Sequence, residues 1–205
     1  MDRSGVVDGR PRSDRPDRRM VDAALACIAR WGVDKTTLDD VARQAGCARA
    51  TVYRSFPGGK EALLRAAVTE ERRRFGDGLA AVLSTTDDLE SLLVDGTCYA
   101  ARFLAEHGAL RTVLAQEPER VLPHVAFAGA DRLLAEAAAL VGPHLEAHLS
   151  PALAARAAEW VTRLVLSYAL APSPTVDLTD TDCTRRLVRT FVLPALRPPT
   201  RGEDR

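Results

Sequence analysis

The sequence predicts an all-α fold with a small N-terminal helical domain and a larger helical domain after it. Apolar residues recur at helical spacing along the 205-residue chain, and no segment alternates as a half-buried strand does. Glycine and proline interrupt the apolar stripes at intervals that suit ordinary helices. We divide the chain into a disordered basic arm at 1–13, an N-terminal helical domain at 14–74 and a C-terminal helical domain at 75–205.

A first helix is predicted over 17–32, with an apolar side and Gly32 as its end. A long helix is predicted from Gly59 to about Leu83. The apolar side of the first helix consists of Val21, Ala24, Leu25, Ile28 and Trp31. Further helices are predicted at 87–106, 108–116, 119–141, 151–171 and 180–196, with breaks at Gly108, Pro118, Gly142-Pro143, Pro151 and Pro172.

Residues 37–56 predict two short helices joined by a tight turn. Thr37 can cap the first helix and Asp40 can reach back to it, as in a capping box. Gly46 suits the left-handed conformation that ends this helix, and the second helix begins near Ala48. Such a pair of helices is the pattern of a helix-turn-helix that reads DNA.

The second helix carries the candidate DNA contacts. Val52 and Phe56 are expected to face the core, and Ala50 to pack against the preceding helix. An Arg-Thr-Tyr-Arg run is usually only a solvated face, but the adjacent helix, the Ala-Gly turn and the basic segment upstream favour a DNA contact. The candidate residues are Thr37, Arg49, Ala50, Thr51, Tyr53, Arg54 and Lys60.

Distinct roles are expected within this set. Arg49 lies at the N-terminal end of the second helix and can pair bidentately with guanine. Tyr53 and Lys60 are expected at phosphates. Thr51 remains open between a thymine methyl and a phosphate.

The charge distribution supports one DNA-binding end. Residues 1–75 contain 16 basic and 11 acidic side chains, whereas the rest contains 12 basic and 17 acidic ones. The net charge of zero is therefore the sum of a basic N-terminal part, residues 1–75, and an acidic remainder.

Residues 18–65 resemble the N-terminal domain of TetR-family transcriptional regulators. The resemblance rests on Arg18-Arg19 in the first helix, the run from Thr36 to Gly46, Tyr53 to Phe56, and Gly59-Lys60. The family commonly has an aliphatic residue and then Ser or Thr where this chain has Cys47-Ala48, so the usual hydroxyl cap of the recognition helix is missing.

The resemblance implies a cytoplasmic homodimer, associated with the nucleoid when bound to DNA. It implies a repressor released from a palindromic operator by a small apolar effector whose identity is unknown. Residues 75–205 would then bind the effector and form the dimer. The resemblance implies a pocket that includes Tyr99, Phe103, Phe127 and Trp160, and a dimer interface that includes Trp160, Leu164, Tyr168, Leu187 and Phe191.

Enzyme, metal and membrane roles are not expected. The sequence has no GxSxG, P-loop or GxGxxG motif, and we expect no catalytic residue, cofactor or metal. His144 and His148 are more readily explained as a solvated pair than as metal ligands. No apolar run is long enough to span a bilayer. The alternative is a helical small-molecule-binding protein or enzyme in which the helix-turn-helix is incidental.

Overall fold

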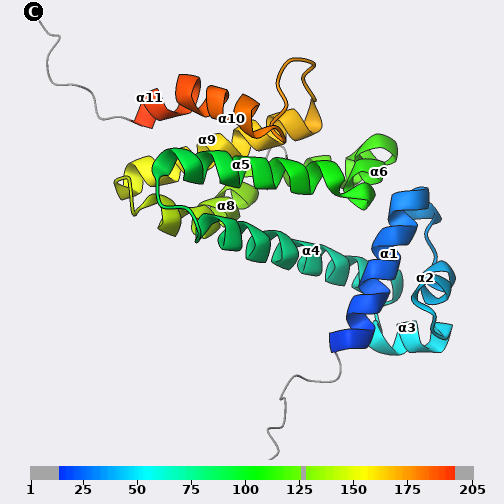
Figure 1. Ribbon diagram of the computed structural model, residues 1–205. Coiled ribbons are helices and arrows are strands. Elements are labelled where there is room, and N and C mark those ends of the chain that lie inside the picture. Colours follow the sequence, from blue (N-terminus) through cyan, green and yellow to red (C-terminus); the bar gives the residue numbers. More distant parts are fainter. Residues whose placement is uncertain (1–13, 126–127, 197–205) are drawn as a thin grey trace, which may run out of the picture. The chain divides into compact units, whose positions relative to one another are not determined.

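A computed structural model describes residues 14–125 and 128–196, and within these ranges every regular element is helical (Figure 1). The chain divides into two compact units, Met1–Glu70 and Glu71–Arg205, which we call the N-terminal and C-terminal units. The all-α prediction is confirmed for the described residues. The basic arm predicted at 1–13 lies outside them.

The N-terminal unit contains α1 (Asp14–Lys35), α2 (Leu38–Ala45), α3 (Arg49–Ser55) and the beginning of α4 (Gly59–Leu83). The predicted end of the first helix at Gly32 is instead an interruption. Gly32 has φ 81°, which glycine adopts without a Cβ clash, and helical structure continues for three more residues to Lys35.

One apolar core joins α1, α2, α3 and α4. The predicted stripe of α1 is largely buried, but Trp31 remains exposed with the guanidinium of Arg30 over its ring. The core side chains of this unit are Met20, Val21, Ala23, Ala24, Cys27, Leu38, Val41, Ala42, Ala45, Val52, Phe56, Leu63 and Ala67.

The turn between α2 and α3 is built as the sequence predicts. The Thr37 hydroxyl accepts the amide of Asp40 at 3.2 Å, and the Asp40 carboxylate accepts the Thr37 amide at 3.1 Å. This capping box satisfies amides that the first turn of α2 leaves without helical partners. At the other end Gly46 is left-handed, with φ 63°, and its amide bonds to carbonyls of α2.

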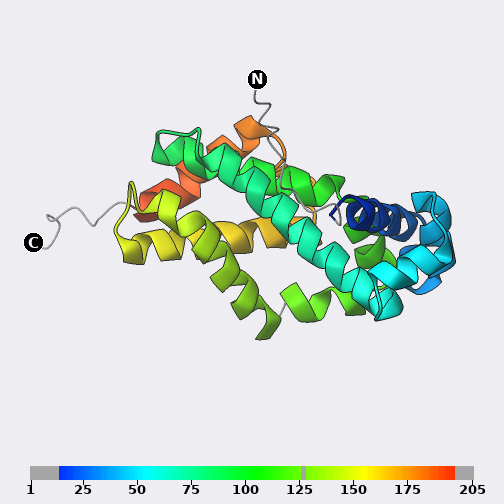
Figure 2. The same ribbon diagram turned by 90° about the horizontal axis from the view of Figure 1, so that it is seen from below.

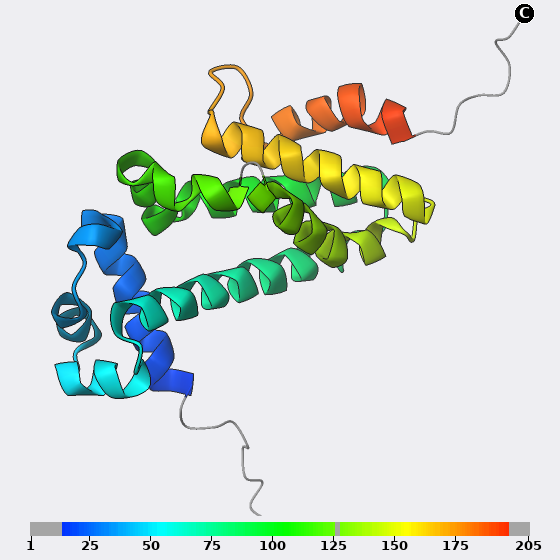
Figure 3. The same cartoon turned by 180° about the vertical axis from the view of Figure 1, so that it is seen from behind.

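The C-terminal unit contains the end of α4 together with all later helices. In this unit α8 and α9 lie side by side (Figures 2 and 3). The bounds are α5 (Leu89–Glu106), α6 (Gly108–Gln116), the 3-10 turn η1 (Pro118–Arg120), α7 (Leu122–Val125), α8 (Ala128–Leu145), α9 (Pro151–Leu170), α10 (Thr181–Leu187), the π-helical turn η2 (Val188–Val192) and α11 (Leu193–Leu196).

The single helix predicted over 119–141 is wrong, because η1, α7 and α8 are separate pieces. Pro123 lacks an amide proton, and its ring would clash with the carbonyl of Glu119 in a continuous helix. The break predicted at Gly142-Pro143 is also displaced, since α8 contains Pro143 and ends at Leu145.

The last helix contains a π-helical turn that its apolar pattern did not predict. The amide of Leu193 bonds to the carbonyl of Val188, five residues back. Pro194 follows and has no amide to continue the ordinary ladder. Val188 and Val192 are buried on one side of this helix, whereas Phe191 is exposed on another.

Polar contacts attach α10 and η2 to α5 at the edge of the core. Glu90 on α5 accepts hydrogen bonds from Arg189 at 2.9 Å and Arg185 at 3.2 Å. These bonds, that from Arg189 first, lower the pKa of Glu90. The core of this unit includes Leu79, Leu83, Leu92, Leu93, Val94, Cys98, Leu145, Ala154, Ala157, Ala158, Val188, Val192 and Leu196.

We expect Thr37→Ala to lower the free energy of unfolding by about 1 kcal/mol, because the mutation removes the oxygen that caps α2. Thr69→Ala is the matched control, since Thr69 is exposed and its hydroxyl donates only to the carbonyl of Arg65 in the same helix. Chemical denaturation followed by circular dichroism measures both changes. Equal values for the two variants would contradict a capping role for Thr37.

The Thr37 effect should depend on pH. Hydrogen bonds from Thr37, its side chain first, lower the pKa of Asp40 below the ordinary 3.8. A lowered pKa in the folded state stabilises the fold above the unfolded pKa, and this stabilisation is lost as the pH falls through the folded pKa. The difference between wild type and Thr37→Ala should therefore shrink below pH 3.8.

Candidate DNA-binding surface

The position of α3 is fixed by its buried side. Val52 is fully buried and Phe56, which follows the helix, is buried too, as the sequence predicts. The opposite side carries exposed Arg49, Tyr53 and Arg54. These three side chains therefore point away from the core of the N-terminal unit.

Ala50 and Thr51 differ from the expected arrangement. Ala50 is exposed, so the prediction that it packs against the preceding helix is wrong. Val52, two residues further along α3, faces the core, so the methyl group of Ala50 lies on the other side of the helix and faces solvent. Thr51 is half-buried, and its hydroxyl lies 3.5 Å from a guanidinium nitrogen of Arg54.

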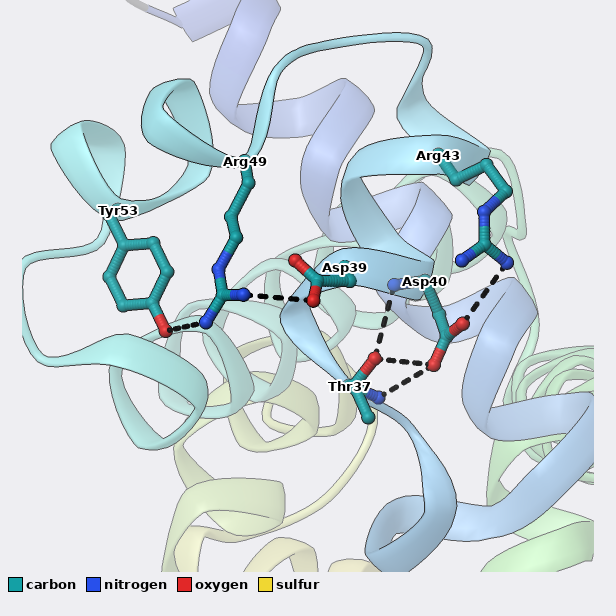
Figure 4. Close-up of polar contacts among 6 residues, drawn as sticks. All are labelled: Thr37, Asp39, Asp40, Arg43, Arg49 and Tyr53. Atoms are coloured by element: carbon teal, nitrogen blue, oxygen red, sulfur yellow. Dashed lines mark hydrogen bonds and ion pairs between the residues drawn. The ribbon is translucent and has the colours of Figure 1, made fainter.

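Arg49 is held by two partners from different helices (Figure 4). Its Nη1 donates to Oδ2 of Asp39 on α2 at 2.9 Å, and its Nη2 donates to the Tyr53 hydroxyl at 3.1 Å. The guanidinium carbon also lies 5.3 Å from the centre of the Tyr53 ring. The Tyr53 hydrogen bond, and then the Asp39 charge, raise the pKa of Arg49, which stays a cation at every physiological pH.

Tyr53 keeps a useful hydrogen while it holds Arg49. Its oxygen accepts from Arg49, so the phenolic hydrogen is left to donate outward. A phosphate oxygen is an acceptor of the kind this hydrogen can bind. Tyr53 can therefore position Arg49 and contact a DNA backbone at the same time.

Thr37 is exposed at the start of α2, but its polar atoms are already used. Its hydroxyl donates to Asp40 at 2.5 Å and accepts from the Asp40 amide, while its own amide donates to the same carboxylate. The structure thus gives Thr37 a capping role. Its contact with DNA stays a prediction.

Lys60 lies in the first turn of α4. Its ammonium donates one hydrogen bond, of 3.2 Å, to the carbonyl of Asp34 near the end of α1. An ammonium has three donors, so two hydrogens remain for another acceptor. Lys60 is half-buried, which leaves its charged end accessible from one side.

Sequence reasoning missed two residues that shape this surface. Asp39 was not among the predicted residues, yet it is the partner of Arg49. Arg19 was not predicted to contact the second helix. Its Nη2 donates to the carbonyl of Ala45 at 2.7 Å and so ties α1 to the end of α2. Arg19 precedes Ala45 by 26 residues, so no local sequence signal predicts this bond.

In the C-terminal unit, two of the predicted pocket residues meet in an aromatic cluster. Phe75 on α4 lies 5.9 Å from Tyr99 and 5.2 Å from Phe103, between ring centres. Phe75 was not predicted. A side chain at Gly78 would overlap the Tyr99 hydroxyl, so the glycine admits the ring. Phe127 lies outside the described residues.

Trp160 is 61% exposed, so within one chain it lies on the surface of α9 and not in an internal pocket. Phe191 is 68% exposed in η2. The other predicted interface residues, Leu164, Tyr168 and Leu187, are half-buried. Two large apolar side chains of the predicted interface are therefore open to a partner, and the pocket role of Trp160 is not supported.

Residues 20–67 match the family described as bacterial regulatory proteins, tetR family. Over 192 residues the chain is 28% identical to the uncharacterised HTH-type transcriptional regulator Rv1255c of Mycobacterium tuberculosis (strain ATCC 25618 / H37Rv), covering 91% of this chain and 88% of the relative. The fold is similar to a putative TetR-family regulator of Mesorhizobium loti MAFF303099, with a TM-score of 0.61 and 22% identity over 89% of this chain and 97% of that one. It is also similar to the TetR-family repressor AlkX of Dietzia sp. strain DQ12-45-1b, with a TM-score of 0.59 and 20% identity over 84% and 92% of the two chains.

The capped α2, the left-handed turn and the outward side of α3 define a helix-turn-helix DNA-binding protein. Residues 20–67 carry the DNA-binding domain described for bacterial regulatory proteins of the tetR family. Together with a relative named as a transcriptional regulator over 91% of this chain, this match supports regulation of transcription rather than catalysis.

Two further findings concern the described residues alone. No set of three or more His, Cys, Asp or Glu side chains there is arranged to hold a metal ion. None of the helices there has the length and apolar character that crossing a membrane requires.

We expect Lys60→Ala to weaken binding to any duplex DNA and to lower the salt slope by about one per subunit, because one phosphate contact is lost. A salt titration with a duplex of random sequence measures the slope. Arg132→Ala in the C-terminal unit removes the same charge and is the control. If the salt slope of Lys60→Ala equals that of wild type, Lys60 does not contact a DNA phosphate.

Proposed function

We propose that this protein is a homodimeric repressor that binds a palindromic operator and leaves it when a small apolar effector binds the C-terminal unit. The observation that carries the proposal is the outward Arg49–Tyr53 pair on α3, opposite the buried Val52. This function would place the protein in the cytoplasm, on the nucleoid when bound to DNA.

The proposed contacts of α3 and of Lys60 on α4 divide between bases and phosphates. Arg49 is the first residue of the helix, the end that meets base edges in helix-turn-helix proteins. The exposed methyl group of Ala50 suits a thymine methyl. Tyr53, Arg54 and Lys60 would hold the backbone, which fixes the register without reading sequence.

A homodimer is supported by the exposed side chains of α9 and η2. Trp160 and Phe191 are the most exposed of the large apolar side chains in the described residues, and an apolar patch that included both would mark an interaction site. A two-fold axis would bring each surface against its own copy. Two α3 helices related by this axis would read two half-sites about one turn of DNA apart.

The effector site is proposed at the aromatic cluster of Phe75, Tyr99 and Phe103. Burial, and then the charge of Asp77, raise the pKa of Tyr99, so the phenol stays neutral and suits an uncharged ligand. Rings in edge contact can separate around a small apolar molecule at moderate cost.

The coupling element is α4. This helix supplies Leu63 to the core of the N-terminal unit and Leu79 and Leu83 to the core of the C-terminal unit. An effector at Phe75 would contact the same helix. It releases DNA only if it binds more tightly to the form with low DNA affinity. A carrier or enzyme with an incidental helix-turn-helix is not favoured, because the relatives are named as transcriptional regulators.

We expect repeated selection from a random duplex library to enrich an inverted repeat with wild-type protein. On the enriched site Arg49→Ala should cost roughly 1–3 kcal/mol per half-site, with little change on random duplex of equal length, because a base contact is lost. Gel-shift titration at fixed salt measures both. Equal losses on the two DNAs would assign Arg49 to phosphates.

We expect light scattering to give wild type about twice its chain mass of 22.2 kDa, and Phe191→Glu to give the monomer mass. Phe191 is exposed within one chain, so the variant should still fold, while a charge buried in an interface without a partner is strongly unfavourable. Leu122→Glu, also at an exposed apolar residue, is the control and should stay dimeric. A monomeric wild type would contradict the two-half-site proposal.

A further inference from the structure

We propose that Asp39 determines specificity: it positions Arg49 for a guanine–cytosine pair and keeps the guanidinium away from phosphates. The inference rests on the proposed function, since it concerns how the same surface chooses its sequence. Asp39 belongs to α2, which precedes the recognition helix, so its role comes from the packing of two helices.

The geometry fixes Arg49 from two sides. Nη1 donates to Asp39 at 2.9 Å, Nη2 donates to the Tyr53 hydroxyl at 3.1 Å, and the guanidinium carbon lies 5.3 Å from the centre of the Tyr53 ring (Figure 4). A free arginine side chain has many rotamers, and ordering it on binding is costly. Here the partners are supplied before DNA arrives.

The guanidinium retains enough donors to read a base. It has five N–H groups, of which Asp39 and Tyr53 each take one. Guanine needs two donors, for O6 and N7. Arg49 can therefore keep its partners and still make a bidentate base contact.

Asp39 has a free acceptor of its own. Within the part of the chain that the structure describes, Arg49 is its only side-chain partner, through Oδ2. Its second oxygen can accept from the N4 amino group of cytosine, which is the base contact that carboxylates prefer. Arginine and aspartate together thus match the donors and acceptors of guanine and cytosine.

Stability does not account for this carboxylate. The side chains of Arg49 and Asp39 are 59% and 50% exposed, and ion pairs so exposed contribute little to folding. A negative charge on a phosphate-binding surface also opposes DNA of every sequence. Its benefit is selective: an arginine already paired with a carboxylate gains less from a phosphate, whereas its contact with guanine is preserved.

The test compares Asp39→Asn with Glu61→Gln, using full-length protein and a random duplex library. Both changes neutralise a carboxylate in the first turn of a helix, and Glu61 is exposed on α4. We expect wild type and Glu61→Gln to enrich guanine at one position of each half-site. Asp39→Asn should lower that enrichment about tenfold, leave the other positions unchanged and bind random duplex more tightly.

Arg49→Lys is the second variant, because it keeps the charge and loses the planar fork. It should lose preference at the same position as Asp39→Asn. Undiminished guanine preference in Asp39→Asn, or loss at a different position from Arg49→Lys, overturns the role of Asp39 while the proposed function stands. If wild type enriches no sequence, the proposed function itself fails, and the role of Asp39 with it. Thermal melting distinguishes these outcomes from a general loss of folding, which would lower enrichment at every position.

Discussion

The DNA-binding surface depends on the burial of one side of a helix that is too short to be stable alone. Arg49–Ser55 makes barely two turns and has no side-chain cap at Ala48, so its own hydrogen bonds cannot maintain it. Val52 and Phe56 anchor it in the core that α1 and α2 build. The capping box and the left-handed Gly46 set where α3 begins, and hence which residues face outward.

Helix α4 contributes side chains to two cores. Leu63 and Ala67 pack in the N-terminal unit, and Leu79 and Leu83 pack in the C-terminal unit. Between these cores the helix carries charged residues that pair along its own surface, such as Arg74 with Glu71 at 2.9 Å.

Local chemistry made much of the fold predictable. The bounds of α4 follow from Gly59 at its start and an apolar pattern that continues to Leu83, and both are as predicted. The division of 119–141 was missed because its apolar periodicity outweighed the signal of Pro123. The contact of Asp39 with Arg49 joins residues ten apart and depends on the angle between α2 and α3, which no local pattern contains. The outward residues of α3 were thus predictable, but their partners were not.

The missing cap at Ala48 has a consequence for protein engineering. A recognition helix that carries its own cap is more easily moved from one protein scaffold to another together with its sequence specificity. Here α3 takes its fold from Val52 and Phe56 in a shared core, and its leading arginine takes its orientation from α2. Specificity should therefore transfer only when the whole segment from Thr37 to Phe56 is moved onto a host whose first helix offers a matching apolar side.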